Sequence, residues 1–313
     1  MGQLHKLIDE HGRQLAARHI ITRRPDRVAM AAASSMADEH MGETSTIIYS
    51  GWCHAGLPHR KTPDEQDWRI QTEHLTLVVE PGKLPNKDGS TSYVGVPYGP
   101  IARLILYYLM DRALETGCRT VTLGKTLTAF LTRLGLSNGG KTHRIIREQV
   151  ERISRCRLTF HLEGNGRRGV ANQAIIDSAM FFDGPNTNND NQASLFTDTL
   201  HLSEGFYNHL RQHNVFLDEK AIEKIHANSR ALDVYSWLAF RLHHLGDPTF
   251  IPWATLRPQF GVGITVKRNF PSVMRDDLML ALSVYEKAKV DILDRGVVLH
   301  PSPPPVQRRP LIR

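Results

Sequence analysis

A glycine-rich stretch at residues 135–142, GLSNGGKT, is the segment whose residue types come closest to a known chemistry. Its spacing matches the phosphate-binding loop G-x-x-x-x-G-K-[ST], in which Lys141 would contact nucleotide phosphates and Thr142 would hold magnesium. Such a loop follows a buried β-strand, whereas residues 127–134 carry apolar side chains at helical spacing. A P-loop NTPase that uses residues 135–142 is therefore the remote alternative.

Other patterns that could support catalysis are weaker. The same turn matches G-x-S-x-G through Ser137, but that motif also needs a preceding strand and a partnered His and Asp. Cys53, His54 and His59 are close in sequence without the paired spacing of a zinc site. DNA-nicking replication enzymes hold a metal with a His-x-His pair, and the sequence contains none. We therefore expect no catalytic residue, no metal and no cofactor, and a protein that acts by binding.

The stretch that follows the glycine turn is strongly basic. Residues 141–157 carry six basic and two acidic side chains, and a helix with Ile146, Val150 and Ile153 inward exposes most of the charge. Arginine suits guanine and phosphate because its planar fork pairs two acceptors at once. The predicted DNA contacts are Lys141, Thr142, Arg144, Arg147, Arg152 and Arg155, with Arg167 and Arg168 contacting the DNA backbone from the following turn at 163–168.

A solvated helix is the alternative interpretation of these charges. Arg144 with Glu148 and Arg147 with Glu151 are spaced i, i+4, as in local salt bridges. The position directly after a glycine turn favours DNA binding, because that is where a helix-turn-helix places its recognition helix. The formal net charge of +7 agrees with an acidic partner such as nucleic acid, although charge says nothing about the fold.

The elements around this helix follow a regular order. A helix begins near Pro100, where a first-turn proline is tolerated, and ends at Gly117. The segments that follow are a strand at 120–123, a helix at 127–134, a turn at 135–140, a helix at 141–155 and strands at 157–162 and 170–176. Helix, strand, helix, turn, helix, strand, wing and strand form the layout of a winged helix-turn-helix.

The same order recurs in the second half of the chain. It begins at Asn228 and continues with a strand at 249–251, a short helix at 253–260, a long helix from Pro271, and a hairpin of strands 290–293 and 297–299. The corresponding contact positions are Lys267, Arg268, Asn269, Ser272 and Arg275, with Asp276 nearby reducing the positive charge. We therefore predict an α+β fold with two winged-helix domains in tandem.

The domain boundaries follow from composition. The chain is divided into a helical, partly flexible N-terminal segment (1–42), winged-helix domain 1 (43–183), a polar linker or loop (184–193), winged-helix domain 2 (194–300) and a disordered Pro/Arg tail (301–313). Three scattered cysteines favour a reducing compartment. No apolar run approaches a membrane span, and the N-terminus lacks the apolar core of a signal peptide. These features predict a cytoplasmic protein without membrane contact.

Several sequence blocks together resemble the plasmid-encoded RepA family of replication initiators. They are GVPYGPIARL (95–104), LGLSNGGKT (134–142), ISRCRLTF (153–160), LPHR (57–60), LVVEPG (77–82), ALDVYSWLAFRLH (231–243) and the stretch from Trp253 through QFG (259–261). The resemblance covers roughly residues 46–300. Because it is distributed over many blocks, it is more specific than any single motif above.

The resemblance implies a function. Such proteins bind repeated sites, called iterons, in a plasmid origin of double-stranded DNA, help to melt nearby A·T-rich DNA, and recruit host helicase and other host replication proteins. Related initiators bind iterons as monomers and repress their own gene as dimers, so a homodimer is one open state. The alternative is a winged-helix transcriptional repressor without a replication role.

Overall fold

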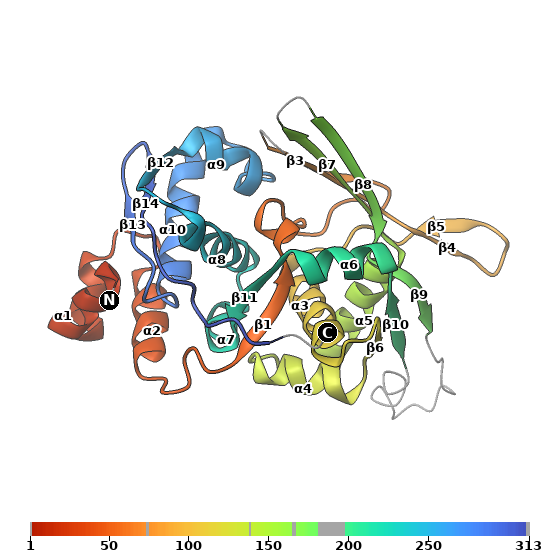
Figure 1. Cartoon of the computed structure of the whole chain (residues 1–313), viewed down its shortest axis with the longest axis horizontal. Helices are drawn as coiled ribbons and strands as arrows, with labels where there is room; N and C mark the ends of the chain where they lie inside the picture. Colours follow the sequence, from red (N-terminus) through yellow and green to blue (C-terminus); the bar gives the residue numbers. More distant parts are fainter. Residues whose placement is uncertain (1, 73–74, 138, 165–166, 181–197, 311–313) are drawn as a thin grey trace. The chain divides into compact units, whose positions relative to one another are not determined.

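The computed structural model describes residues 2–72, 75–137, 139–164, 167–180 and 198–310, and between 162 and 173 it describes the backbone alone. These residues form two compact units (Figure 1). Unit 1 is Met1–Gly56 with Val215–Arg309, and unit 2 is Leu57–Asn214 with Pro310–Arg313. The fold is mixed α+β, as predicted. Because unit 1 combines residues 1–56 with residues 215–309, the units are not consecutive along the chain as the predicted domains are, and the predicted boundaries stay a prediction. The predicted linker at 184–193 lies outside the described residues.

Unit 2 is built around a buried helix. Its helices are α3 (Gly99–Thr116), α4 (Lys125–Arg133), α5 (Gly140–Arg155) and α6 (Glu204–Gln212). Its strands are β2 (Trp68–Gln71), β3 (Leu75–Glu80), β4 (Lys83–Pro85), β5 (Thr91–Tyr93), β6 (Thr120–Thr122), β7 (Arg157–Gly164), β8 (Arg167–Ala174), β9 (Ile176–Met180) and β10 (Thr199–Leu202). Leu104, Ile105 and Leu109 of α3 are fully buried, and Gly117 ends the helix in the left-handed conformation. The helix therefore forms the centre of this core.

The strands of unit 2 form separate antiparallel sheets. One sheet has the order β2-β3-β7-β8, a second has the order β6-β10-β9, and β4 pairs with β5 in a hairpin. The predicted order of elements over residues 100–176 is found. The predicted turn at 163–168 is wrong, because β7 extends to Gly164 and β8 begins at Arg167. Arg167 and Arg168 lie on β8, opposite Gly164 and Glu163 of β7, because the ladder continues to the end of the hairpin.

Unit 1 contains the second copy of the predicted order. Its helices are α1 (Gln3–His19), α2 (Pro25–Met36), η1 (Ser50–Cys53), α7 (Glu219–Ile225), α8 (Ser229–Arg241), η3 (Leu242–His244), α9 (Trp253–Phe260), η4 (Lys267–Asn269) and α10 (Phe270–Leu282). Its strands are β1 (Ser45–Tyr49), β11 (Asn214–Asp218), β12 (Thr249–Pro252), β13 (Val290–Ile292) and β14 (Gly296–Leu299). β1 pairs with β11, and the other three strands form an antiparallel sheet of order β12-β14-β13.

The core of unit 1 lies between α8 and α10. Asn228 begins α8 by accepting hydrogen bonds from the backbone N–H groups of Arg230 and Ala231, as N-cap residues do. Tyr235 of α8 is fully buried, as are Met274 and Leu278 of α10. The Tyr235 ring meets that of Tyr285, which follows α10, edge to face with 5.8 Å between centroids. Burial of this kind contributes about 1.5–3 kcal/mol per large apolar side chain, so the packing of these two helices stabilises the unit.

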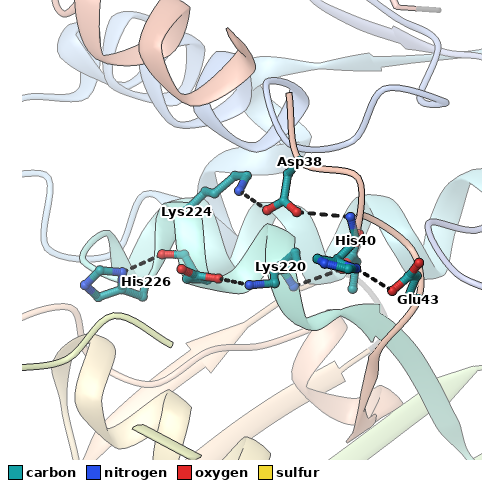
Figure 2. Close-up of polar contacts among 8 residues, drawn as sticks. Asp38, His40, Glu43, Lys220, Lys224 and His226 are labelled. Atoms are coloured by element: carbon teal, nitrogen blue, oxygen red, sulfur yellow. Dashed lines mark hydrogen bonds and ion pairs between the residues drawn. The ribbon is translucent and has the colours of Figure 1, made fainter. Parts of the chain in front are cut away.

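The N-terminal segment is packed into unit 1. Helix α2 contacts α7 and α10 and buries Val28, Ala29 and Ala32. The segment after α2 is fixed to α7 (Figure 2): Lys224 Nζ donates to Asp38 Oδ2 over 2.6 Å, and Asp218 accepts a hydrogen bond from the backbone N–H of Gly42. The hydrogen bond from Lys224 lowers the pKa of Asp38. The predicted leader is therefore a folded part of the unit.

The proline-rich tail packs on unit 1 over residues 302–306, within the segment 301–313 that the sequence predicts to be disordered, and residues 311–313 lie outside the described residues. Ser302 and Val306 are buried, and the Ser302 backbone N–H donates to the carbonyl of Leu242. Tyr285 donates its hydroxyl to the carbonyl of Pro303 over 2.7 Å. Prolines lack an N–H but keep their carbonyl, so an extended proline segment can still accept hydrogen bonds from the core.

Among the described residues, the helices are too short or too polar to cross a lipid bilayer.

Candidate nucleic-acid interface

Helix α5 has one buried face and one basic face. Ile146, Val150 and Ile153 are at most 3% exposed, as their spacing predicts. Lys141, Arg144 and Arg147 are exposed on the N-terminal half of the helix, and we call these three residues the α5 basic face. Because the first turns of a recognition helix reach base edges in the major groove, the charge lies at the end where contact is expected.

The two acidic residues of α5 pair toward its C-terminal end. Glu148 accepts from Arg152 over 3.1 Å, and Glu151 accepts from Arg155 over 2.5 Å. The alternative pairing of Arg144 with Glu148 is not the one adopted. Within the part of the chain that the structure describes, neither Lys141 nor Arg144 forms an ion pair. Both cations are therefore available for phosphate or guanine.

Arg152 must be removed from the predicted DNA contacts, because its side chain is only 3% exposed. It donates to Glu148, to Asp64 Oδ1 over 2.9 Å and to the carbonyl of Val96 over 3.1 Å. The guanidinium also lies over the ring of Tyr98, 5.2 Å from its centroid. We call Arg152, Asp64, Glu148 and the Val96 carbonyl the Arg152 cluster. The cluster joins α5 to the segments 57–64 and 95–98 and so fixes the orientation of the helix.

Gly95 makes room for this cluster. A Cβ atom there would lie 2.1 Å from Arg152 Nη1 and 2.4 Å from Asp64 Oδ1, and the residue has φ +83°. Both the left-handed backbone and the close approach require glycine.

We predict that Gly95→Ala lowers the free energy of unfolding by about 2 kcal/mol through backbone strain and displacement of the Arg152 guanidinium. Urea unfolding of the full chain measures this. Gly89→Ala is the matched control, since Gly89 also has a positive φ but no atom within 4 Å of its Cβ position. If both variants lose the same free energy of unfolding, the loss comes from backbone strain alone, and the close approach of Arg152 to Gly95 contributes nothing.

Arg103 makes a second structural contact within the GVPYGPIARL block. It is 3% exposed, and its guanidinium donates to the carbonyls of Leu57 over 2.7 Å and of Pro58 over 3.2 Å. Sequence reasoning assigned no role to Arg103 or Gly95. Arg103 is the fifth residue of α3, and an arginine in an otherwise apolar helix start is the signal that could have indicated burial with carbonyl partners.

The turn before α5 lacks the strand that a phosphate-binding loop needs. Helix α4 ends at Arg133, and Gly135 follows with φ +82°. Leu136 donates its backbone N–H to the carbonyl of Leu131, which closes the end of the helix. Thr142 is half-buried, and its hydroxyl lies 3.2 Å from that of Ser137. The segment therefore connects two helices, as the apolar spacing predicted.

The remaining predicted contacts of unit 2 differ in how they are placed. Arg155 is partly buried and forms an ion pair with Glu151. A contact between Arg155 and DNA would require this ion pair to break. Arg167 and Arg168 have a described backbone on β8, and their side chains lie outside the described residues.

The predicted contacts of unit 1 are on η4 and α10. Lys267, Arg268, Asn269 and Ser272 are all exposed. Arg275 is only partly exposed: its Nη2 donates to the carbonyl of Leu293 over 2.8 Å and lies 3.3 Å from Asp294 Oδ1. Arg275 therefore connects α10 to the β13–β14 turn.

A buried carboxylate holds α10 to α8. Asp277 lies 3.1 Å from Arg230 Nη1 and accepts from Asn228 Nδ2 over 2.9 Å, and Arg230 Nε donates to the carbonyl of Phe260. Burial raises the pKa of Asp277, and the charge of Arg230 opposes that rise. This network joins the start of α8 to α10 and to the C-terminal end of α9.

Comparisons with known proteins agree with the sequence resemblance. Residues 96–250 match the sequence model of a family described as plasmid encoded RepA protein, which is about half of the chain. No curated protein sequence is similar enough to count as a match. A crystal structure of domains 2 and 3 of RctB is similar over 80% of this chain and 97% of its own, with 12% identity and a TM-score of 0.51. A second structure, of RctB residues 155–483, covers 80% and 94% with 13% identity and a TM-score of 0.47. At 12% identity the likeness to the first of these structures is one of fold alone.

Proposed function

Since residues 96–250 belong to the plasmid-encoded RepA family, we propose that this chain is a plasmid replication initiator that binds repeated origin sequences in duplex DNA. The observation that supports this most is the α5 basic face. Three exposed cations lie at the N-terminal half of a helix after a tight turn, and both acids of that helix pair with Arg152 and Arg155 instead. That arrangement fits insertion of the helix into a major groove.

The proposed mechanism separates positioning from sequence recognition. Phosphate contacts from lysine and arginine supply most of the affinity, and log K falls by about 0.9 per contact for each log unit of salt. Base contacts from α5, with a second set from η4 and α10, choose the sequence, each bidentate contact contributing about 1–3 kcal/mol. The order of elements around each of these helices supports two winged-helix modules, with the sheet β12-β14-β13 as the clearer example.

The family resemblance also supports the later steps of the proposal. The bound chain would promote melting of A·T-rich origin DNA, recruit host helicase and initiator proteins, and repress its own gene, in the cytoplasm and without catalysis of its own. Both monomer and homodimer fit this scheme.

A footprint on the DNA that flanks the gene tests the proposed function. We expect protection of direct repeats beside an A·T-rich stretch, because an initiator must bind where the duplex opens. Protection of a promoter palindrome alone would favour the transcriptional repressor. Magnesium-dependent nucleotide hydrolysis that is lost in Lys141→Ala would instead support the NTPase and contradict the DNA-binding role of the turn.

A further inference from the structure

The second predicted contact surface carries an acid whose partner comes from the other end of the sequence. Asp276 lies on α10 beside Arg275, where a negative charge would repel phosphate. Its Oδ1 accepts from the backbone N–H of Arg23 over 2.9 Å, and its Oδ2 accepts from Arg23 Nε over 2.5 Å. The pair is separated by 253 residues in sequence, so periodicity could not reveal it.

This contact fixes the position of the segment between α1 and α2. Arg24 donates its backbone N–H to Thr22 Oγ1 over 3.1 Å, and Thr22 donates its backbone N–H to the carbonyl of Ile20. Ile20 and Ile21 line a cavity together with Arg275 and Met279 of α10. Residues 20–24 therefore form a loop that is held beside α10 through Asp276.

The fixed loop adds positive charge next to that helix. Arg23 keeps 58% of its side chain exposed although it pairs with Asp276, Arg24 is exposed, and Arg27 is half-exposed in the first turn of α2. Asp26 is the one acid between Arg23 and Arg27. Among the described residues, Arg24 and Arg27 form no ion pair. With Asp276 neutralised, the local charge is clearly positive.

We propose that residues 23–27 form an N-terminal arm that contacts the phosphate backbone of DNA beside α10. The inference rests on the proposed function. It adds phosphate contacts beside the middle of α10 to those of Lys267, Arg268 and Ser272. Lys267, Arg268 and Ser272 cover the N-terminal end of α10, and the arm extends the basic surface along the middle of the helix. An arginine in such a position binds phosphate with two parallel hydrogen bonds.

The test compares salt dependence of binding for a short mixed-sequence DNA duplex, using the full chain. Arg24→Gln with Arg27→Gln removes both unpaired arginines and keeps the Arg23–Asp276 pair. We expect the slope of log K against log salt to become less steep by about 1.8, since each lost phosphate contact contributes about 0.9. At physiological salt the affinity should fall about fivefold per contact.

Lys6→Gln with Lys287→Gln is the matched control, because it removes the same charge from exposed positions of unit 1 outside the arm. An unchanged slope for the arginine variant overturns the inference, and so does an equal loss of slope in the control, which would reflect net charge alone. Tighter binding of the arginine variant overturns it too, because the arm would then screen α10. If the unmodified chain does not bind the duplex at all, the proposed function itself fails.

Discussion

Arg152→Ala is expected to lower the free energy of unfolding by about 3 kcal/mol, the lower end of the range for breaking a buried ion pair. The side chain is 3% exposed and bridges Asp64, Glu148 and the Val96 carbonyl. Removing it takes away this donor from the Val96 carbonyl and opens a cavity beside Gly95. Asp64 then keeps its ion pair with Lys61, and Glu148 keeps the hydrogen bond from the Tyr98 hydroxyl. The carboxylates are each 38% exposed, so water compensates part of the loss, which is why the lower end applies.

Arg155→Ala provides the control for this prediction. Arg155 pairs with Glu151 at the same i, i+4 spacing on the same helix, but both side chains are about one third exposed. Ion pairs whose two side chains both reach solvent contribute at most about 1 kcal/mol, so urea unfolding should separate the two variants by about 2 kcal/mol. Equal midpoints for both would mean that the Arg152 cluster does not hold α5, and Arg152 would return to the set of DNA contacts.

The helices and their order were predictable because their apolar spacing is regular and their ends carry clear signals. Gly117 ends α3 in the left-handed conformation, and Asn228 begins α8 with a side-chain cap, as expected for these residue types. The buried face of α5 followed from Ile146, Val150 and Ile153 at helical spacing. Capping residues and apolar spacing were therefore sufficient for helices whose ends and buried face depend only on their own residues.

Contacts between distant segments were not predictable in this way. Asp276 was interpreted as an acid that weakens the second surface, although Arg23 neutralises it. Arg152 was counted as a DNA contact because a helical wheel cannot show that Asp64 and the Val96 carbonyl cover one edge of the helix. In both examples the partner lies more than 50 residues away, where no periodicity applies.

Short and irregular strands were missed for a related reason. β4 and β5 have three residues each and are mostly exposed, so neither alternation nor apolar content distinguishes them from loop. The tail at 301–306 was assigned to disorder on composition, yet its carbonyls and Val306 pack on the core. Composition shows that such a segment cannot form a core of its own. It does not show whether the segment packs against a core formed by other residues.

Lys141→Ala with Arg144→Ala is expected to reduce specific DNA binding about a hundredfold and to leave stability nearly unchanged. Loss of one bidentate base contact costs about 1–3 kcal/mol, and loss of one phosphate contact adds about a further fivefold. Both side chains are exposed and form no ion pair among the described residues, so unfolding should shift by no more than about 0.5 kcal/mol. Titration of the footprinted site, with a thermal melt of the same samples, measures both quantities.

Arg69→Ala with Lys87→Ala removes the same charge from exposed positions of unit 2 that lie outside the α5 basic face. A general charge effect would weaken all duplexes equally in both double variants, because phosphate contacts carry no sequence information. Sequence recognition by α5 requires more: the Lys141 and Arg144 variant must lose preference for its own site over mixed-sequence duplex, while the control keeps it. If the ratio of the two affinities is the same in all proteins, α5 does not read the sequence, and the contacts that choose the site must come from unit 1.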